Sequence, residues 1–122
     1  MTQESDKTTE VVRLTRRPQF LFVRGGWIER RKSLAVEARR RAPDGVMGEG
    51  FTATKKVGGA VIRNRAKRRL RAGAATLLPI HGAPGVDYVF IARKDTADIA
   101  WARLLDDMES ALVSLARRAR DT

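Results

Sequence analysis

The sequence predicts an α+β domain with two layers, in which helices pack against one sheet. Two observations support this prediction. Apolar residues recur with the alternating period of strands in some segments and with the helical period in others. These segments follow the chain order helix, strand, strand, helix, strand, helix, and no internal repeat is present. A chain of 122 residues, 43% of them hydrophobic, also has enough apolar material for one domain with its own core.

A short helix is expected over residues 17–24. Pro18 suits the first position of a helix, and Gly25 and Gly26 would end it. The helix would expose Phe20 or Phe22 to a neighbouring surface.

Two strands are expected after this helix. In KSLAVEARRR, Leu34, Val36 and Ala38 alternate with polar residues, and Phe51 and Ala53 do so in GFTATKKV. The turn-rich segment APDGVMGEG would connect the two strands and make the second antiparallel to the first.

The helical period takes over from residue 60 to about residue 78, and Pro79 is expected to end that helix. Its apolar stripe consists of Ile62, Ala66, Leu70, Gly73 and Leu77. VDYVFIARK then has the nearly continuous apolar run of a strand that is buried on both faces. A last helix follows, with an apolar face made of Trp101, Leu104, Leu105, Met108, Leu112 and Leu115.

The N-terminal residues do not resemble a targeting signal. Residues 1–12 are polar and aperiodic, which predicts a flexible N-terminal leader and neither a signal peptide nor a transit peptide. One folded domain would span residues 13–118, and residues 119–122 would form a basic C-terminal end. No apolar run approaches the roughly 18 residues of a spanning helix. The absence of cysteine fits a reducing compartment, so a cytoplasmic protein is expected.

The charge balance indicates the partners of this protein. Lys and Arg number 25 against 14 Asp and Glu, which gives a formal charge of +11. Such an excess favours nucleic acid or an anionic membrane as a partner. Most of the excess is Arg, whose planar guanidinium suits bidentate contacts with phosphate.

The basic charge is concentrated in KKVGGAVIRNRAKRRLR, residues 55–71. On a helical wheel centred on Ile62, the side chains that point away from the core are Asn64, Lys67, Arg68 and Arg71. Arg63, Arg65 and Arg69 fall at the margins of the apolar stripe. Lys55 and Lys56 precede Gly58 and Gly59, and a helix that begins after paired glycines offers backbone N–H groups to a phosphate.

A solvated helix face is the alternative explanation of such a charge run. Solvated faces usually contain acids that pair with the cations, but no acid occurs between Glu49 and Asp87. Like charges one turn apart destabilise a helix by roughly 0.2–0.5 kcal/mol per pair. The pattern therefore favours a polyanion, and nucleic acid above all.

The kind of nucleic acid follows from weaker signals. No helix-turn-helix spacing or zinc-ligand set is present, so sequence-specific DNA binding has no support. A sheet with aromatic residues beside a basic helix suits stacking on unpaired bases. Phe20 is the best candidate for such stacking, although packing of the first helix onto the sheet would explain it equally well. Phe51, Phe90 and Trp101 are expected in the core.

Catalysis by the chain itself is not expected. His81 is the only histidine and lies in a Pro- and Gly-rich segment without a neighbouring acid in the sequence. Asp106, Asp107 and Glu109 fit partly exposed positions of an amphipathic helix better than a metal site. We therefore expect no catalytic and no metal-ligating residue in this chain.

The segment FTATKKVGGAVIRNRAKRRLR resembles the signature of the protein subunit of bacterial ribonuclease P. The matching positions are Thr54, Lys55, Lys56, Val57, Gly58, Ala60, Val61, Arg63, Asn64, Arg65, Lys67, Arg68 and Arg71. VDYVFIARK and RLTRRPQF are similar to other parts of that family, and the resemblance covers about residues 14–115.

The resemblance implies an α-β-β-α-β-α sandwich with a left-handed β-α-β crossover, as in a small-subunit ribosomal protein and one domain of elongation factor G. It also implies an RNA subunit that, with bound Mg²⁺, hydrolyses precursor tRNA at the mature 5′ end. One protein per RNA would hold both the RNA subunit and the 5′ leader of the substrate, and no membrane would be involved.

The resemblance further implies which residues meet RNA. The RNA-binding residues would be Lys55, Lys56, Arg63, Asn64, Arg65, Lys67, Arg68 and Arg71. Phe20, Arg24 and Lys56 would line or flank a leader cleft between the sheet and the first helix. The chain departs from many family members at Gly59, where they have Asn, and at Arg24, where they have a second aromatic residue.

Two other function classes compete with this interpretation. A ribosomal or RNA-chaperone protein of similar topology would bind structured RNA without a nuclease role and without preference for a 5′ leader. A stand-alone nuclease would need an acid cluster or a histidine pair, which the sequence does not offer.

Overall fold

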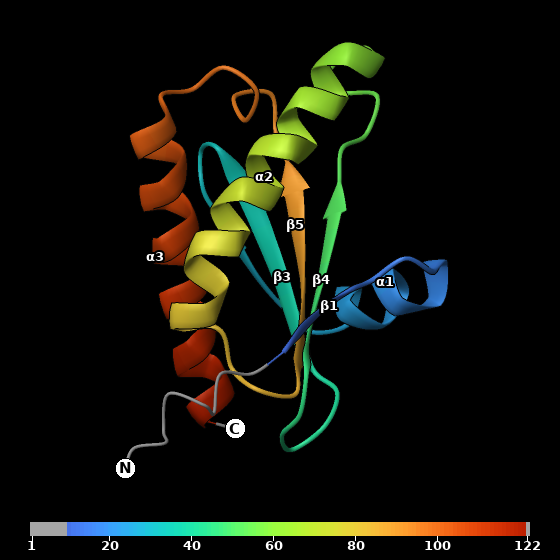
Figure 1. The fold of residues 1–122 in the computed structure, drawn as a ribbon, viewed down its shortest axis with the longest axis vertical. Coiled ribbons are helices and arrows are strands. Elements are labelled where there is room, and N and C mark those ends of the chain that lie inside the picture. The colour runs from blue at the N-terminus through green and yellow to red at the C-terminus, as the bar shows by residue number, and fades with distance from the viewer. Residues whose placement is uncertain (1–9, 122) are drawn as a thin grey trace.

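The computed structural model describes residues 10–121, which form one five-stranded sheet and three helices (Figure 1). In chain order the elements are β1 (Val11–Arg13), α1 (Arg17–Arg24), β2 (Trp27–Arg30), β3 (Leu34–Arg40), β4 (Met47–Thr52), α2 (Ala60–His81), β5 (Val86–Ala92) and α3 (Trp101–Asp121). Within this part of the chain, no helix is both long enough and apolar enough to cross a membrane.

The sheet is mixed, with the strand order β1-β4-β5-β3-β2. The central strand β5 is antiparallel to β3 and parallel to β4, so β3 and β4 run in opposite directions on its two sides. The expected antiparallel relation of these strands is therefore confirmed, although they do not pair with each other. Val89 of β5 lies opposite Glu37 of β3 and Gly50 of β4.

The connection from β4 through α2 to β5 is left-handed. With the strands pointing upward and α2 in front of the sheet, β5 lies to the left of β4 (Figure 1). Parallel strands are joined by right-handed connections in about 98% of cases, so this hand is uncommon. It agrees with the expectation that came from the family resemblance.

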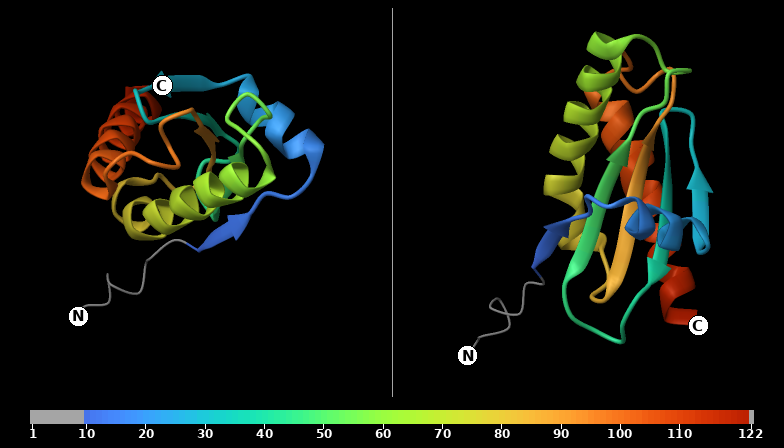
Figure 2. Two further views of the ribbon diagram at one scale, coloured as in Figure 1. Left: turned by 90° about the horizontal axis from the view of Figure 1, so that it is seen from above. Right: turned by 90° about the vertical axis from the view of Figure 1, so that its right-hand side faces the viewer.

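The main core lies between one face of the sheet and the pair α2 and α3. Its fully buried side chains include Leu34, Val36, Tyr88 and Phe90 from the sheet and Leu70, Leu104, Met108 and Leu112 from the helices. Helix α1 stands apart from α2 and α3, on the other side of the sheet (Figure 2). There Leu14 and Val23 pack against Val89, so β5 is buried on both faces as its apolar run predicted.

Two strands were not expected from the sequence. β1 takes Val11 and Val12 from the segment predicted to be a flexible leader and pairs with β4, while residues 1–9 lie outside the described residues. β2 forms an antiparallel pair with β3. Both strands are short and lie at the edges of the sheet, where few side chains are buried and alternation is weak.

The second predicted strand lies earlier in the chain than expected. β4 begins at Met47, inside the predicted turn, and ends before Ala53. Gly48 and Gly50 hide its alternation, because neighbouring side chains occupy the space where their own would be. A Cβ at Gly48 would lie 2.4 Å from an oxygen of Asp87, and one at Gly50 would lie 2.6 Å from the Phe20 ring.

Helix α2 is longer than predicted and continues through Pro79 to His81. Pro79 lacks the N–H that would bond to the carbonyl of residue 75, and Ala75 is exposed, so its carbonyl can bond to water instead. At the other end, the first turn of α2 extends beyond the ends of the strands (Figure 1). Val61 is therefore 79% exposed and Ile62 is 37% exposed, and the predicted apolar stripe is buried only from Ala66 onward.

Trp101 is 41% exposed and does not belong to the core, contrary to its prediction. It begins α3, and the guanidinium of Arg69 lies 5.6 Å from the centre of its ring. The remaining apolar residues of α3 face the core as predicted, with Leu105 only partly buried.

Candidate nucleic-acid interface

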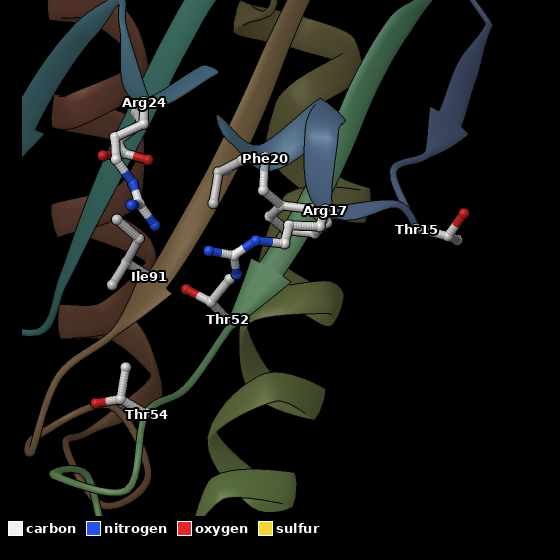
Figure 3. A pocket seen from close by; sticks show the side chains of 9 residues that line it. Thr15, Arg17, Phe20, Arg24, Thr52, Thr54 and Ile91 are labelled. Carbon is white, nitrogen blue, oxygen red and sulfur yellow. The ribbon is translucent and has the colours of Figure 1, made fainter. Parts of the chain in front are cut away.

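A hollow of about 480 Å³ lies between α1 and the sheet, and we call it the α1 groove (Figure 3). It is lined by residues from α1, from the segment before it, from three strands and from the segment after β4: Thr15, Arg17, Phe20, Arg24, Glu37, Thr52, Thr54, Val89 and Ile91. The groove therefore has an apolar floor, hydroxyl groups and a rim that carries positive charge.

Helix α1 presents one face to the groove. Arg17, Phe20 and Arg24 are spaced at i, i+3 and i+7, which places them on the same side of a helix. The side chains of Arg17 and Arg24 point into the hollow (Figure 3).

The N-terminal end of α1 is fixed by a side chain. Oε1 of Gln19 accepts hydrogen bonds of 2.8 Å from the backbone N–H groups of both Thr15 and Arg16. Pro18 lies in the first turn, as predicted. Because the helix start is held in this way, its groove-facing side chains have a defined position over the sheet.

Phe20 both packs on the sheet and lines the α1 groove. Its ring lies over Gly50, where a side chain would collide with it, and it contacts the small cluster around Val89. The two explanations that the sequence left open for Phe20 are therefore compatible with one position. Phe22 lies on another side of α1, where the Arg39 guanidinium is 4.4 Å from the centre of its ring.

Glu37 is the only acidic side chain among the groove-lining residues. Burial raises the pKa of its carboxyl group, while the nearby charges of Arg24 and Arg30 act in the opposite direction. An ionised carboxylate at this place would repel the phosphates of a bound nucleic-acid strand. A glutamate is therefore unexpected in a groove that binds only phosphate.

Lys56 lies beside the α1 groove rather than in it. A second hollow, of about 590 Å³, contains Lys56 together with Lys32, Arg93 and Lys94, and we call it the lysine hollow. It shares Thr54 and Ile91 with the α1 groove, so the two hollows adjoin. Phe20 and Arg24 in the α1 groove and Lys56 in the lysine hollow therefore lie on one side of the molecule.

The residues of the predicted basic surface divide into exposed and half-buried ones. Those that are exposed to solvent are Lys55, Lys56, Asn64, Arg65 and Arg68. Arg63 is half-buried and donates a hydrogen bond of 2.9 Å to the carbonyl of Gly58, closing the turn before α2. Gly58 has a φ of 151°, a conformation that side chains rarely adopt, which explains a glycine at this position.

Lys67 and Arg71, which the helical wheel directed away from the core, are less exposed than Asn64 and Arg68. They are half-buried and face the edge of β4, where they line a hollow of about 250 Å³ together with Arg13, Phe20 and Phe51. Phe51 is itself half-buried, stacks on Phe90 with ring centres 5.4 Å apart, and has the Arg13 guanidinium 5.2 Å from its ring centre. A helical wheel describes one helix alone, so it could not show the neighbouring residues that partly cover Lys67 and Arg71.

Arg69 has a structural role that its sequence neighbours do not share. Its guanidinium donates hydrogen bonds of 2.6 Å to the carbonyls of Thr96 and Ile99 and lies against Trp101. It therefore fastens α2 to the turn before α3.

Sequence reasoning missed Arg17 and Arg13 as candidate site residues. Arg17 could have been found from its i, i+3, i+7 spacing with Phe20 and Arg24. Arg13 gave no such signal, because its place depends on the unexpected strand β1 and on its pairing with β4.

His81, Glu109 and Asp107 have structural partners, whereas Asp106 is exposed. His81 is the last residue of α2 rather than a loop residue, and its Nε2 lies 3.0 Å from Oε2 of Glu109. His81 has no acidic neighbour in the sequence, but the fold brings Glu109 of α3 next to it. Asp107 accepts hydrogen bonds from the backbone N–H and the hydroxyl of Ser33. Within residues 10–121, no group of three or more His, Asp or Glu residues could hold a metal ion.

The chain was compared with known protein families and proteins. The family model described as Ribonuclease P matches residues 9–116. The chain belongs to the ribonuclease P protein family. It is 50% identical over 114 residues to the ribonuclease P protein component of Caulobacter vibrioides, covering 93% of this chain and 76% of the relative. It is 47% identical over 105 residues to that of Ruegeria pomeroyi, covering 84% of each chain.

Solved structures of ribonuclease P proteins have the same fold. The protein from Thermotoga maritima superposes with a TM-score of 0.71 at 23% identity, covering 84% of this chain and 96% of that one. The protein from Staphylococcus aureus gives a TM-score of 0.69 at 23% identity, covering 82% and 91%. As the protein component of a ribonucleoprotein endoribonuclease, a member of this family has an RNA partner.

Proposed function

We propose that this chain binds the catalytic RNA of ribonuclease P and the 5′ leader of precursor tRNA, and so supports endonucleolytic 5′ maturation of tRNA in the cytoplasm. One observation supports this most: the α1 groove, with its apolar floor and cationic rim, lies beside a helix whose exposed surface is basic. A single-stranded leader suits the groove, because unpaired bases stack on aromatic and apolar side chains while arginines hold phosphates.

The two RNAs would occupy different surfaces. The leader would lie in the α1 groove, with Phe20 under a base and with Arg17, Arg24 and Lys56 near phosphates. The catalytic RNA would contact Lys55, Arg63, Asn64, Arg65, Lys67, Arg68 and Arg71 around α2. Bringing both RNAs to one small cationic protein would reduce the repulsion between their backbones.

The catalytic centre belongs to the RNA subunit in this proposal. Mg²⁺ held by that RNA would activate the attacking water and stabilise the charge that develops during hydrolysis. The protein's side chains would position the leader and neutralise phosphate charge, with one protein for each RNA.

Reconstitution tests this proposal directly. The full chain is added to a bacterial ribonuclease P RNA and a precursor tRNA at low Mg²⁺, and 5′ cleavage is followed over time. We expect the protein to increase cleavage and to increase the affinity for precursor tRNA more than the affinity for mature tRNA.

The other outcomes have clear meanings. No gain in cleavage would reject the proposal, and equal affinity for substrates with and without a leader would favour a ribosomal or RNA-chaperone role. Cleavage by the protein without the RNA would indicate a stand-alone nuclease.

A further inference from the structure

Within residues 10–121, the Glu37 carboxylate has no hydrogen-bond or ion-pair partner, although the charges of Arg24 and Arg30 lie nearby. Glu29, Glu49 and Glu109 each have a basic side chain at 3.0 Å, 3.7 Å and 3.0 Å respectively. A half-buried carboxylate in an open groove is therefore left with its acceptor capacity unused.

The surroundings of Glu37 are those of a base-binding site. Across the sheet it lies between Val89 of β5 and Ile28 of β2, so the carboxylate rises from an apolar strip. Ile91 and the Phe20 ring extend this strip, while the cationic ends of α1 lie above it (Figure 3). A base could stack on the apolar surface with its edge toward Glu37 and its phosphate toward the arginines.

The chemistry of a carboxylate restricts which base edge it accepts. An ionised carboxylate has two acceptor oxygens and no donor. On the pairing edge, only guanine offers two adjacent N–H donors, at N1 and N2. Adenine and cytosine each place one amino group beside a ring nitrogen whose lone pair would repel the carboxylate, and uracil places one N–H between two carbonyls. The bidentate match is therefore with guanine.

We infer that Glu37 selects a guanine base in the leader strand that occupies the α1 groove. This inference rests on the proposed function, because it requires the leader to enter the groove. In this arrangement the carboxylate rejects bases that present acceptors to it, as a site built for a hydrogen bond rejects ligands that lack the partner. Glu37 is thus a specificity residue that contacts substrate and takes no part in the chemical step.

The experiment places a single guanosine at successive positions of the leader. Precursor tRNAs with an otherwise uridine-only leader carry one guanosine, at each leader position in turn, and their affinity for the reconstituted holoenzyme is measured. We expect one position at which guanosine tightens binding about tenfold, the effect of a good bidentate pair with a base. Inosine at that position, which lacks the N2 amino group, should recover only part of the gain.

Substitution of Glu37 assigns the effect to its side chain. Glu37→Gln keeps the size but replaces one acceptor oxygen by a donor, so the guanosine preference should disappear. Glu109→Gln is the matched control, because it removes the same charge from the surface of α3, outside the groove. It should keep the preference.

Each outcome separates the inference from the proposed function. Leader-dependent affinity that is equal for all bases, or a guanosine preference that persists in Glu37→Gln, would overturn the inference and leave the proposed function standing. Loss of affinity on 2′-deoxy substitution without any base preference would assign Glu37 to the ribose and overturn it as well. If Glu37→Gln strengthens binding of every leader equally, the glutamate is only a counter-charge to Arg24 and Arg30. If the leader adds no affinity at all, the proposed function itself fails.

Discussion

At the scale of single residues, arginines that look alike in the sequence have different environments. Arg65 and Arg68 are exposed and make no hydrogen bond or ion pair with any residue in the described range. Arg69, next in the chain, donates two short hydrogen bonds to backbone carbonyls and lies against Trp101. Removal of these side chains should therefore affect RNA binding in one case and folding in the other.

Replacing Arg65 or Arg68 by Ala should weaken binding of the catalytic RNA without changing the melting temperature. Each phosphate contact that is lost should reduce the slope of log affinity against log salt concentration by up to about 0.7–0.9. Titrations at several salt concentrations measure this slope. Arg117→Ala, on the exposed side of α3, is the control. Unchanged slopes for Arg65→Ala and Arg68→Ala would place both arginines outside the RNA contact.

Replacing Arg69 by Ala should instead destabilise the fold. The carbonyls of Thr96 and Ile99 would lose a charged donor, and a hydrogen bond to a charged group contributes about 1.5–3 kcal/mol. Chemical denaturation should show a loss in the free energy of unfolding of that order. Wild-type stability in this variant would mean that water replaces the guanidinium at little cost.

At the scale of elements, the position of α1 depends on the glycine beneath it. Phe20 can lie close to β4 because Gly50 has no side chain, and this contact sets the distance between α1 and the sheet at the groove. The width of the α1 groove is therefore determined by a residue of β4 that does not line it.

Gly50→Ala should displace Phe20 and change the α1 groove. The new Cβ would lie 2.6 Å and 2.8 Å from two ring carbons of Phe20, and overpacking of this kind costs about 1–3 kcal/mol of unfolding free energy. The affinity for precursor tRNA should fall while that for mature tRNA is unchanged. Gly59→Ala serves as the stability control, because nothing lies within 4 Å of its added Cβ. Normal leader binding by Gly50→Ala would show that the placement of Phe20 is unimportant.

The same glycines explain how far the elements could be predicted. Helices α2 and α3 and strands β3 and β5 have regular apolar periods, because each buries a complete face against a neighbour. β4 has Gly48 and Gly50 at two of its buried positions, so its pattern was shifted onto the residues that follow. When side chains of other elements cover the buried glycines of a strand, the strand's own sequence shows no apolar alternation.

At the scale of the whole molecule, several carboxyl groups are held in surroundings that oppose their ionisation. Burial raises the pKa of Glu37, Glu49 and Asp87, although Arg24, Arg13 and Arg41 act against this effect. A folded state that holds a proton more tightly than the unfolded state loses stability as the pH rises through the raised pKa. These groups thus reduce stability at neutral pH in a molecule of net charge +11.

Glu37→Gln should therefore raise the melting temperature at neutral pH. The advantage should fade as the pH falls from the raised pKa of Glu37 toward the ordinary carboxyl value of 4.5, because the wild-type side chain becomes neutral over this range. Thermal unfolding of both proteins across this range measures the difference, and Glu109→Gln controls for the change in net charge. A variant that is less stable than wild type at neutral pH would show that Glu37 gains more from its arginines than it loses by burial.

The candidate site could be predicted only in part, because it combines distant segments. The basic surface of α2 lies within one segment, and its exposed members were named from spacing and family resemblance. The α1 groove joins α1 to β3, β4 and β5, so Glu37 and Arg17 could be recognised as its lining only once the sheet order was known. The basic surface could be predicted because its charges follow one another in the sequence. The α1 groove could not, because its lining comes from segments that only the fold brings together.

The first turn of α2, which extends beyond the sheet, should differ from the rest of the helix in amide hydrogen exchange. Val61 and Ile62 pack against little of the core, and the cations that follow them repel one another, so this turn opens at a low cost in free energy. Its amide protons should exchange with deuterium well before those around Leu70, and bound RNA should slow them. Uniform protection along α2 in the free chain would contradict this. If the prediction holds, the N-terminal part of α2, which carries most of its positive charge, becomes fully ordered only when RNA binds.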